Sequence, residues 1–299
     1  MGHGTWTTAS YCDYSTTKGY NMTTSTSGIN ILNTAYTVQD LFKERRLNSA
    51  LNPYNIVREC CDTEEHPETI PVILALDVTG SMGSGAAEVA KKLNEVMTEL
   101  YDKVKDVEFC VMGIGDLAYD DAPIQMSQFE SDIRIAEHLD KVYFEGGGGG
   151  NRYESYTAAW YMGLNHTALD CWKRGKKGII ITMGDEMLNP YLPYNELNGA
   201  TGDKNQANIE TDDLYARASE KFDIYHIAVN DKLTSYRYHQ DDINSKNSYG
   251  KYLDEDHFLT RSIDSIAPTI VDIITRSAAG VPMEPIGATN TNAEGEIVW

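Results

Sequence analysis

The sequence lacks a long apolar run: no uncharged stretch approaches the roughly 18 residues that a membrane-spanning helix needs. Basic residues are also scarce, with 25 Lys and Arg against 45 Asp and Glu and a net charge of −20. This balance argues against a nucleic-acid-binding protein, because phosphate contacts need clustered Lys and Arg. It favours positively charged ligands or partners, cations among them. We therefore expect neither membrane nor nucleic acid as a partner.

Targeting signals and paired cysteines are missing as well. The first ten residues lack the basic and apolar regions of a signal peptide, and Trp6 stands where N-myristoylation requires Ser or Thr. The five cysteines are odd in number and show no C-x-x-C spacing, and the seven histidines are scattered. We expect reduced thiols in a cytoplasmic protein and no zinc site.

A regular pattern begins near residue 70. Unbroken apolar runs predict strands buried on both faces at 71–77, 107–114, 178–182 and 223–229. Amphipathic stretches predict helices at 84–104, 153–169, 211–221 and 262–277. We also expect a short strand at 142–144, a long polar loop at 187–210, and a packing role for Tyr156. Strands that alternate with helices predict a doubly wound α/β domain with a mostly parallel sheet. We assign this domain to residues 69–279, between an irregular N-terminal extension (1–68) and an extended C-terminal tail (280–299).

Oxygen-bearing side chains follow the apolar strands, at the sheet edge where α/β proteins bind ligands. Asp77, Thr79 and Ser81 alternate after the first strand, and Asp185 follows the strand at 178–182. Between them in the sequence, five glycines lead into Asn151. Carboxylates and hydroxyls that converge in this way suit a hard divalent cation such as Mg²⁺.

This arrangement resembles the von Willebrand factor A (VWA) family over roughly residues 70–278. The D-x-T-x-S motif, the glycine-rich loop and the later Gly-Asp are similar, in order and spacing, to the family's metal-ion-dependent adhesion site. The resemblance implies a Rossmann-like fold and a metal site made of Asp77, Thr79, Ser81, Asn151 and Asp185. Asn151 is the best match to the Thr that the family usually has in the second loop, and Glu154 and Ser155 are the other candidates in that loop. The implied cofactor is Mg²⁺, with Mn²⁺ or Ca²⁺ as alternatives.

The resemblance also implies a non-enzymatic module that binds a protein partner, whose carboxylate completes the coordination of the metal. It is greatest to intracellular VWA proteins of bacteria and phages, some of which act beside AAA+ ATPases. Near the site, Asp116, Glu154 and Glu186 predict an acidic rim, which suits a second cation or a basic partner surface. Asp116 and the nearby Asp120 and Asp121 otherwise read as solvated loop residues.

Two other functions remain open on the sequence. The metal could lock the loops of a structural or assembly protein. Alternatively, the first loop also resembles the phosphorylated-aspartate loop of P-type ATPases. In that phosphohydrolase, Asp77 is the nucleophile, Thr79 positions it, Lys176 or Lys177 balances the phosphate charge, and Asp185 binds Mg²⁺.

Overall fold

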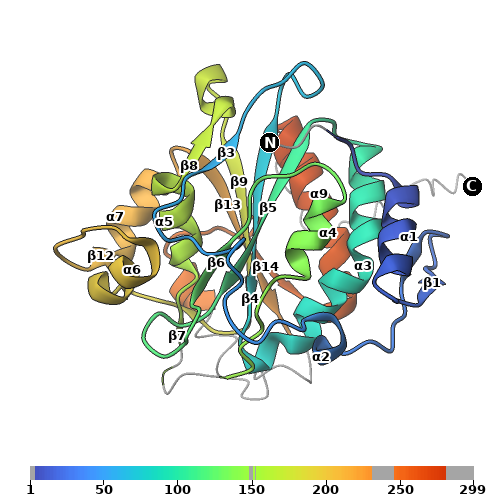
Figure 1. The fold of residues 1–299 in the computed structure, drawn as a ribbon. Helices are drawn as coiled ribbons and strands as arrows, with labels where there is room; N and C mark the ends of the chain where they lie inside the picture. Colours follow the sequence, from blue (N-terminus) through green and yellow to red (C-terminus); the bar gives the residue numbers. More distant parts are fainter. Residues whose placement is uncertain (1–3, 148–150, 152, 231–245, 281–299) are drawn as a thin grey trace, which may run out of the picture.

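A six-stranded sheet forms the centre of the molecule (Figure 1). The computed structural model describes residues 4–147, 151, 153–230 and 246–280. The strand order is β14-β13-β9-β4-β5-β6, and every neighbouring pair is parallel except β5 and β6. The strands are β4 (Ile70–Asp77), β5 (Val107–Ile114), β6 (Ile124–Met126), β9 (Gly178–Gly184), β13 (Phe222–Val229) and β14 (Phe258–Arg261). The predicted doubly wound, mostly parallel α/β fold is confirmed.

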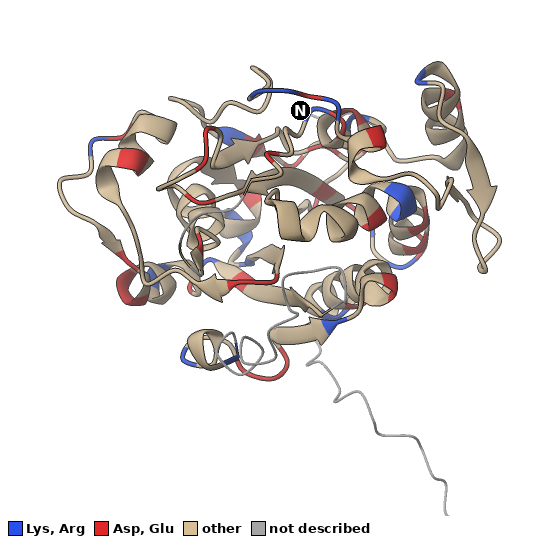
Figure 2. Ribbon diagram, turned by 90° about the horizontal axis from the view of Figure 1, so that it is seen from below, with Lys and Arg blue, Asp and Glu red and all other residues tan. Residues whose placement is uncertain are grey.

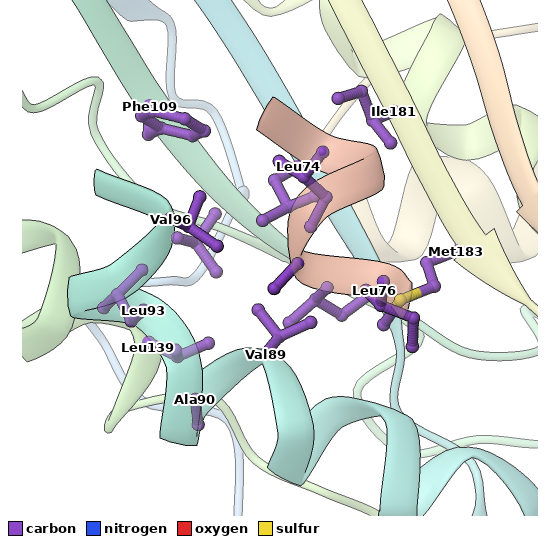
Figure 3. Close-up of a cluster of buried hydrophobic side chains, with 14 of the residues drawn as sticks. Leu74, Leu76, Val89, Ala90, Leu93, Val96, Phe109, Leu139, Ile181 and Met183 are labelled. Atoms are coloured by element: carbon purple, nitrogen blue, oxygen red, sulfur yellow. The ribbon is translucent and has the colours of Figure 1, made fainter. Parts of the chain in front are cut away.

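Helices cover both faces of this sheet (Figure 1). Helices α3 (Gly83–Tyr101), α4 (Arg134–Leu139) and α9 (Ile266–Ala279) lie on one face, and α5 (Thr157–Asn165), α6 (Tyr194–Thr201) and α7 (Thr211–Ala218) lie on the other. Successive side chains of a strand point to opposite faces. Leu74 and Leu76 of β4 therefore pack with Val89 and Leu93 of α3 (Figure 3). Ile73 lies in the other core.

Shorter elements lie around this frame. They are α1 (Thr8–Thr17), β1 (Met22–Thr24), β2 (Asn30–Leu32), α2 (Val38–Leu41), β3 (Arg58–Cys60), β7 (Tyr153–Glu154), β8 (Thr167–Leu169), β10 (Met187–Leu188), β11 (Tyr191–Leu192) and β12 (Ile209–Glu210). Short 3₁₀ turns are η1 (Gly80–Met82), η2 (Asp170–Arg174) and η4 (Ile263–Ser265). Among the described residues, no helix is long and apolar enough to cross a membrane.

The observed elements differ from the predicted ones in three places. The helix predicted at 153–169 begins only at Thr157, because Tyr153–Glu154 pair in parallel with β10 instead. Helix α6 lies inside the predicted loop at 187–210, and it ends at Gly202, whose positive φ of 83° closes the helix. The predicted strand at 142–144 has no regular structure. All five cysteines are free.

The N-terminal residues pack on the central domain. Trp6, Tyr11 and Leu32 are buried in the same core as α3. The indole Nε1 of Trp6 donates to Oδ1 of the buried Asn94 at 2.9 Å, and Asn94 Nδ2 donates to the Asn30 carbonyl at 2.8 Å. The first thirty residues, for which the sequence left open an irregular segment or an arm that packs on another part, include a helix and strand residues that cover α3. The predicted tail at 280–299 lies outside the described residues except for Gly280.

One buried imidazole makes stability sensitive to acid. His226 of β13 is fully buried, stacks on Tyr249 with ring centroids 4.1 Å apart, and lies 2.8 Å from Thr182 Oγ1. Burial lowers the pKa of His226 to about 3. The pKa of a histidine in the unfolded chain is near 6.5. The contribution of the neutral, buried His226 to the free energy of unfolding is therefore complete above that pH and is lost as the pH falls toward 3.

We therefore expect His226→Phe to reduce the acid sensitivity of the fold. Phenylalanine keeps the aromatic stack and removes the titrating group. Between pH 6.5 and 4.5 the wild type should lose roughly 2–3 kcal/mol of unfolding free energy more than the variant. Urea unfolding at several pH values measures, for each protein, the slope of the unfolding free energy against pH. Parallel slopes would show that His226 does not control the acid response.

Candidate functional site

The carboxyl ends of β4, β9 and β5 meet at one edge of the sheet, the lower side of Figure 1 and the side facing the reader in Figure 2. Asp77 is the last residue of β4, Asp185 follows β9 directly, and Asp116 lies two residues beyond β5. Since β4 lies between the other two strands, the three acids come from neighbouring strand ends. This confirms that the three strands carrying these residues end at the same edge.

Asp77 is fully buried and accepts three hydrogen bonds. Its Oδ1 accepts from the Thr79 backbone N at 2.8 Å and from Thr79 Oγ1 at 2.6 Å. Its Oδ2 accepts from the Tyr156 hydroxyl at 2.6 Å. Burial and the nearby Asp185 charge nevertheless raise the pKa of Asp77 above its ordinary value. Asp77 thus lies where a positive charge would be favoured.

Ser81 joins the first loop to the third. Its hydroxyl donates to Asp185 Oδ1 at 2.9 Å. In an octahedral Mg²⁺ shell with metal–oxygen distances of 2.0–2.1 Å, adjacent oxygens are about 2.8–3.0 Å apart. The Ser81–Asp185 distance falls within that range, and the Thr79–Asp77 distance of 2.6 Å is slightly shorter. Because a hydroxyl oxygen carries lone pairs beside its proton, the same oxygens can ligate a cation while each hydroxyl keeps its proton.

The glycine-rich loop lies against the first loop. The Gly80 backbone N donates to the Gly147 carbonyl at 2.8 Å, and Glu145 N donates to the Val78 carbonyl at 3.1 Å. A Cβ atom on Gly80 would lie 2.8 Å from the Gly146 carbonyl oxygen. Glycine at position 80 therefore allows the close approach of the two backbones. Gly148–Gly150 lie outside the described residues.

Asn151, the predicted ligand of the second loop, is exposed, and both ends of its amide are engaged. Its Nδ2 donates to Asp116 Oδ2 at 2.6 Å, and its Oδ1 accepts from the Tyr153 backbone N at 3.1 Å. The structure therefore places the Asn151 side chain against Asp116. It does not bring Asn151 into the hydrogen-bonded group of Asp77, Thr79, Ser81 and Asp185.

The predicted acidic rim is mostly buried. Asp116 and Glu154 are 4% and 5% exposed, and only Glu186 is partly exposed. The expectation that Asp116 is a solvated loop residue is wrong, because its carboxylate accepts from both Asn151 and the Ala118 backbone N and closes the loop after β5. A partner on the outer surface can therefore meet Glu186 but not the carboxylates of Asp116 and Glu154.

Tyr156 belongs to the site, although the sequence assigned it only to packing. It precedes α5, and its hydroxyl both donates to Asp77 and accepts from the Glu186 backbone N at 3.3 Å. A Cβ atom on Gly184 would lie 2.0 Å from this hydroxyl oxygen. The glycine that ends β9 is the sequence feature that permits this contact. Its role appears only when the Tyr156 ring is placed.

The arrangement gives less support to a metal site made of acids, Cys and His alone and to a phosphohydrolase. Among the residues that the structure describes, no three His, Cys, Asp or Glu side chains converge closely enough to hold a metal by themselves. A cation at Asp77 thus needs hydroxyl ligands as well.

The phosphohydrolase hypothesis requires Lys176 or Lys177 near Asp77. Both lysines precede β9, whereas Asp185 follows it. Seven residues of strand span about 23 Å, so these lysines lie at the opposite edge.

Comparisons with known proteins give similarity of fold only. No family model matches the chain, and no curated protein matches it. Similar solved structures include the pilus adhesin SpaC from Lactobacillus rhamnosus GG (TM-score 0.43, 12% identity, 75% of this chain and 31% of that chain). They also include the vWF domain of the type V pili tip protein Mfa5 from Porphyromonas gingivalis (TM-score 0.43, 13% identity, 73% and 98%).

A third similar structure is BatB, a conserved hypothetical protein from Bacteroides thetaiotaomicron (TM-score 0.39, 13% identity, 70% of this chain and 99% of that chain). The chain thus spans about a third of SpaC and nearly all of the Mfa5 domain and BatB. At these TM-scores and identities, the likeness carries no argument about function. The α/β fold of the chain rests on its own strand order and registers.

Proposed function

We propose that this chain is a non-enzymatic protein-binding module that uses a divalent cation, preferably Mg²⁺, held at the end of β4. The observation that carries the proposal is the junction of two hydroxyl–carboxylate pairs, Thr79 with Asp77 and Ser81 with Asp185. These four side chains supply hard oxygen ligands from two neighbouring strand ends. The cation would supply a Lewis-acidic position at which an oxygen of a partner protein can bind.

Exposed aromatic side chains beside the site support a protein partner. Tyr119, in the loop after β5, is 59% exposed, and Tyr153, next to Glu154, is 38% exposed. Tyrosine is enriched in protein interfaces because its ring is apolar and its hydroxyl polar. Glu186 adds an acidic group. An AAA+ ATPase as the partner, bacterial or phage origin and a cytoplasmic location stay predictions.

The proposal is tested by calorimetric titration of the metal-stripped protein with Mg²⁺, Mn²⁺ and Ca²⁺. Asp77→Asn should abolish saturable binding, because one ligand carboxylate becomes a neutral amide. At a free cation concentration of 100 times Kd, the wild type should gain about 2.7 kcal/mol of unfolding free energy, and the variant should gain none.

Asp213→Asn is the matched control, because Asp213 is exposed on α7 and the substitution removes the same charge. It should bind the cation as the wild type does. Affinity capture should then retain a partner on the wild type and Asp213→Asn in Mg²⁺, and release it in EDTA or with Asp77→Asn. Unfolding of the wild type on chelation would favour the structural role instead. Equal cation binding by all three proteins would mean that the acidic surface, not this site, binds the metal.

A further inference from the structure

The segment that carries Glu154 crosses the end of β4. On one side, β7 pairs in parallel with β10, which places Glu154 opposite Leu188 in the loop that follows Asp185. On the other side, the Ser155 backbone N donates to the Gly115 carbonyl at 3.3 Å, and Ser155 Oγ accepts from the Leu117 backbone N at 3.0 Å. The segment is thus fixed to the loops after β9 and β5. Since β4 lies between those strands, Glu154 is held over the end at which Asp77 lies.

Glu154 brings a carboxylate to this position without a partner for one of its oxygens. The residue is 5% exposed, and its Oε2 has no hydrogen-bond partner among the described residues. The charged side chains that act most strongly on it are all acids, namely Asp77, Asp120, Asp116 and Glu186. The first of these, Asp77, lies in the proposed cation site. A buried carboxylate among acids is costly unless it is neutralised by a proton or a cation.

A second buried polar atom at the same place is also unsatisfied. The Tyr249 hydroxyl has no hydrogen-bond partner among the described residues, and its side chain is fully buried. The charges of Asp77, Glu186, Asp185 and Glu154 all act on it. Two unsatisfied oxygens beside the same carboxylates indicate a position that a further polar species completes.

Asn151 is poorly placed for that role. It is exposed, and its amide is already used by Asp116 and by the Tyr153 backbone. The contact between Asn151 and Asp116 instead fixes the start of the second loop. The two candidates in this loop therefore differ. Asn151 is exposed and its amide is hydrogen-bonded at both ends, whereas Glu154 is buried and its Oε2 has no hydrogen-bond partner among the described residues.

We propose that Glu154, and not Asn151, is the second-loop ligand of the cation, acting together with the hydroxyl–carboxylate pairs Thr79–Asp77 and Ser81–Asp185 rather than in a cluster of three carboxylates. This inference rests on the proposed function, because it assigns a ligand to the same ion. It replaces a neutral second-loop ligand with a charged one. Since the number of ligand charges controls cation affinity, Glu154 should contribute strongly to binding.

The experiment compares Glu154→Gln with Asn151→Ala in calorimetric Mn²⁺ and Mg²⁺ titrations of the metal-stripped, full-length protein. Glu154→Gln has the same shape and lacks the charge, so cation affinity should fall at least tenfold. Asn151→Ala should change it less than threefold. The thermal unfolding midpoint in EDTA should not fall in Glu154→Gln, because the variant removes a buried carboxylate that lacks a hydrogen-bond partner for one oxygen.

Each of the following outcomes would overturn the inference. If Glu154→Gln is folded and binds the cation as the wild type does, Glu154 is a buried neutral acid without a ligand role, and the proposed function stands. If only Asn151→Ala loses affinity, the ligand is Asn151. If the wild type binds no cation, the proposed function fails and the inference fails with it. Should Glu154→Gln not fold, Glu154→Asp keeps the charge on a shorter side chain and should bind more weakly than the wild type. Unchanged affinity in that variant contradicts the assignment.

Discussion

Gly184→Ala is expected to lower the free energy of unfolding by about 3–5 kcal/mol. The new Cβ atom would lie 2.0 Å from the Tyr156 hydroxyl oxygen and 2.3 Å from Cζ, so the whole end of the ring must move. That movement breaks the 2.6 Å hydrogen bond from Tyr156 to the buried Asp77. The loss therefore combines overpacking with a buried carboxylate oxygen, Asp77 Oδ2, that has lost its Tyr156 donor, while Oδ1 keeps its two hydrogen bonds from Thr79. Urea unfolding in EDTA measures it without the contribution of a bound metal.

Gly199→Ala is the control for this substitution. Gly199 lies in α6, and an added Cβ atom there would meet no heavy atom within 4 Å. Alanine within a helix is favoured over glycine by roughly 0.5–1 kcal/mol, so this variant should be as stable as the wild type or more stable. A Gly184→Ala protein with the wild-type unfolding midpoint would show that Tyr156 does not occupy the position described.

A chain that begins at residue 69 is expected not to fold into a soluble monomer. Removing the extension would uncover the apolar surface of α3, which the extension covers with a set of buried side chains: Trp6, Tyr11, Tyr20, Leu32, Leu41 and Phe42. It would also remove β3, which pairs with β8. The test measures how much of the protein is in the soluble fraction. Circular dichroism and gel filtration of that fraction then show whether it is folded and monomeric.

Single substitutions refine this test. Trp6→Ala should lower the unfolding free energy by about 3–5 kcal/mol, because it empties a buried indole site. It also takes away the donor that Asn94 Oδ1 accepts. Tyr54→Ala changes an aromatic residue of the same extension that is 51% exposed, so it should cost little. A folded, monomeric 69–299 chain would mean that the extension is an accessory rather than part of the core.

The central strands could be predicted because each needs apolar side chains on both faces. The predicted strand at 71–77 corresponds to β4, which begins one residue earlier, and the run at 107–114 is β5. In contrast, β14 has only four residues, Phe258–Arg261, of which two are buried apolar residues, so no apolar run marks it. The order of the strands could not be derived, because a crossover helix does not specify which strand becomes its neighbour.

The site was predictable to the extent that it depends on strand ends. Asp77 and Asp185 lie together because β4 and β9 are neighbours. The burial of Glu154 and the contact of Tyr156 with Asp77 depend on how the loop before α5 is held. That loop is fixed by β7 and β10, which have two residues each and no recognisable period. Tertiary pairing of such short segments leaves no local signal in the sequence.

The extension has a consequence for synthesis on the ribosome. The Trp6 backbone N donates to the Ser131 carbonyl, Arg58 N to the His166 carbonyl, and Asn55 N to the Thr201 carbonyl, each at 2.8 Å. At ordinary elongation rates, on the order of ten seconds separates the emergence of Asn55 from that of Thr201. The extension therefore leaves the ribosome well before its partners and waits for them. During that interval its aromatic side chains are exposed, which makes the nascent chain a natural client for a chaperone.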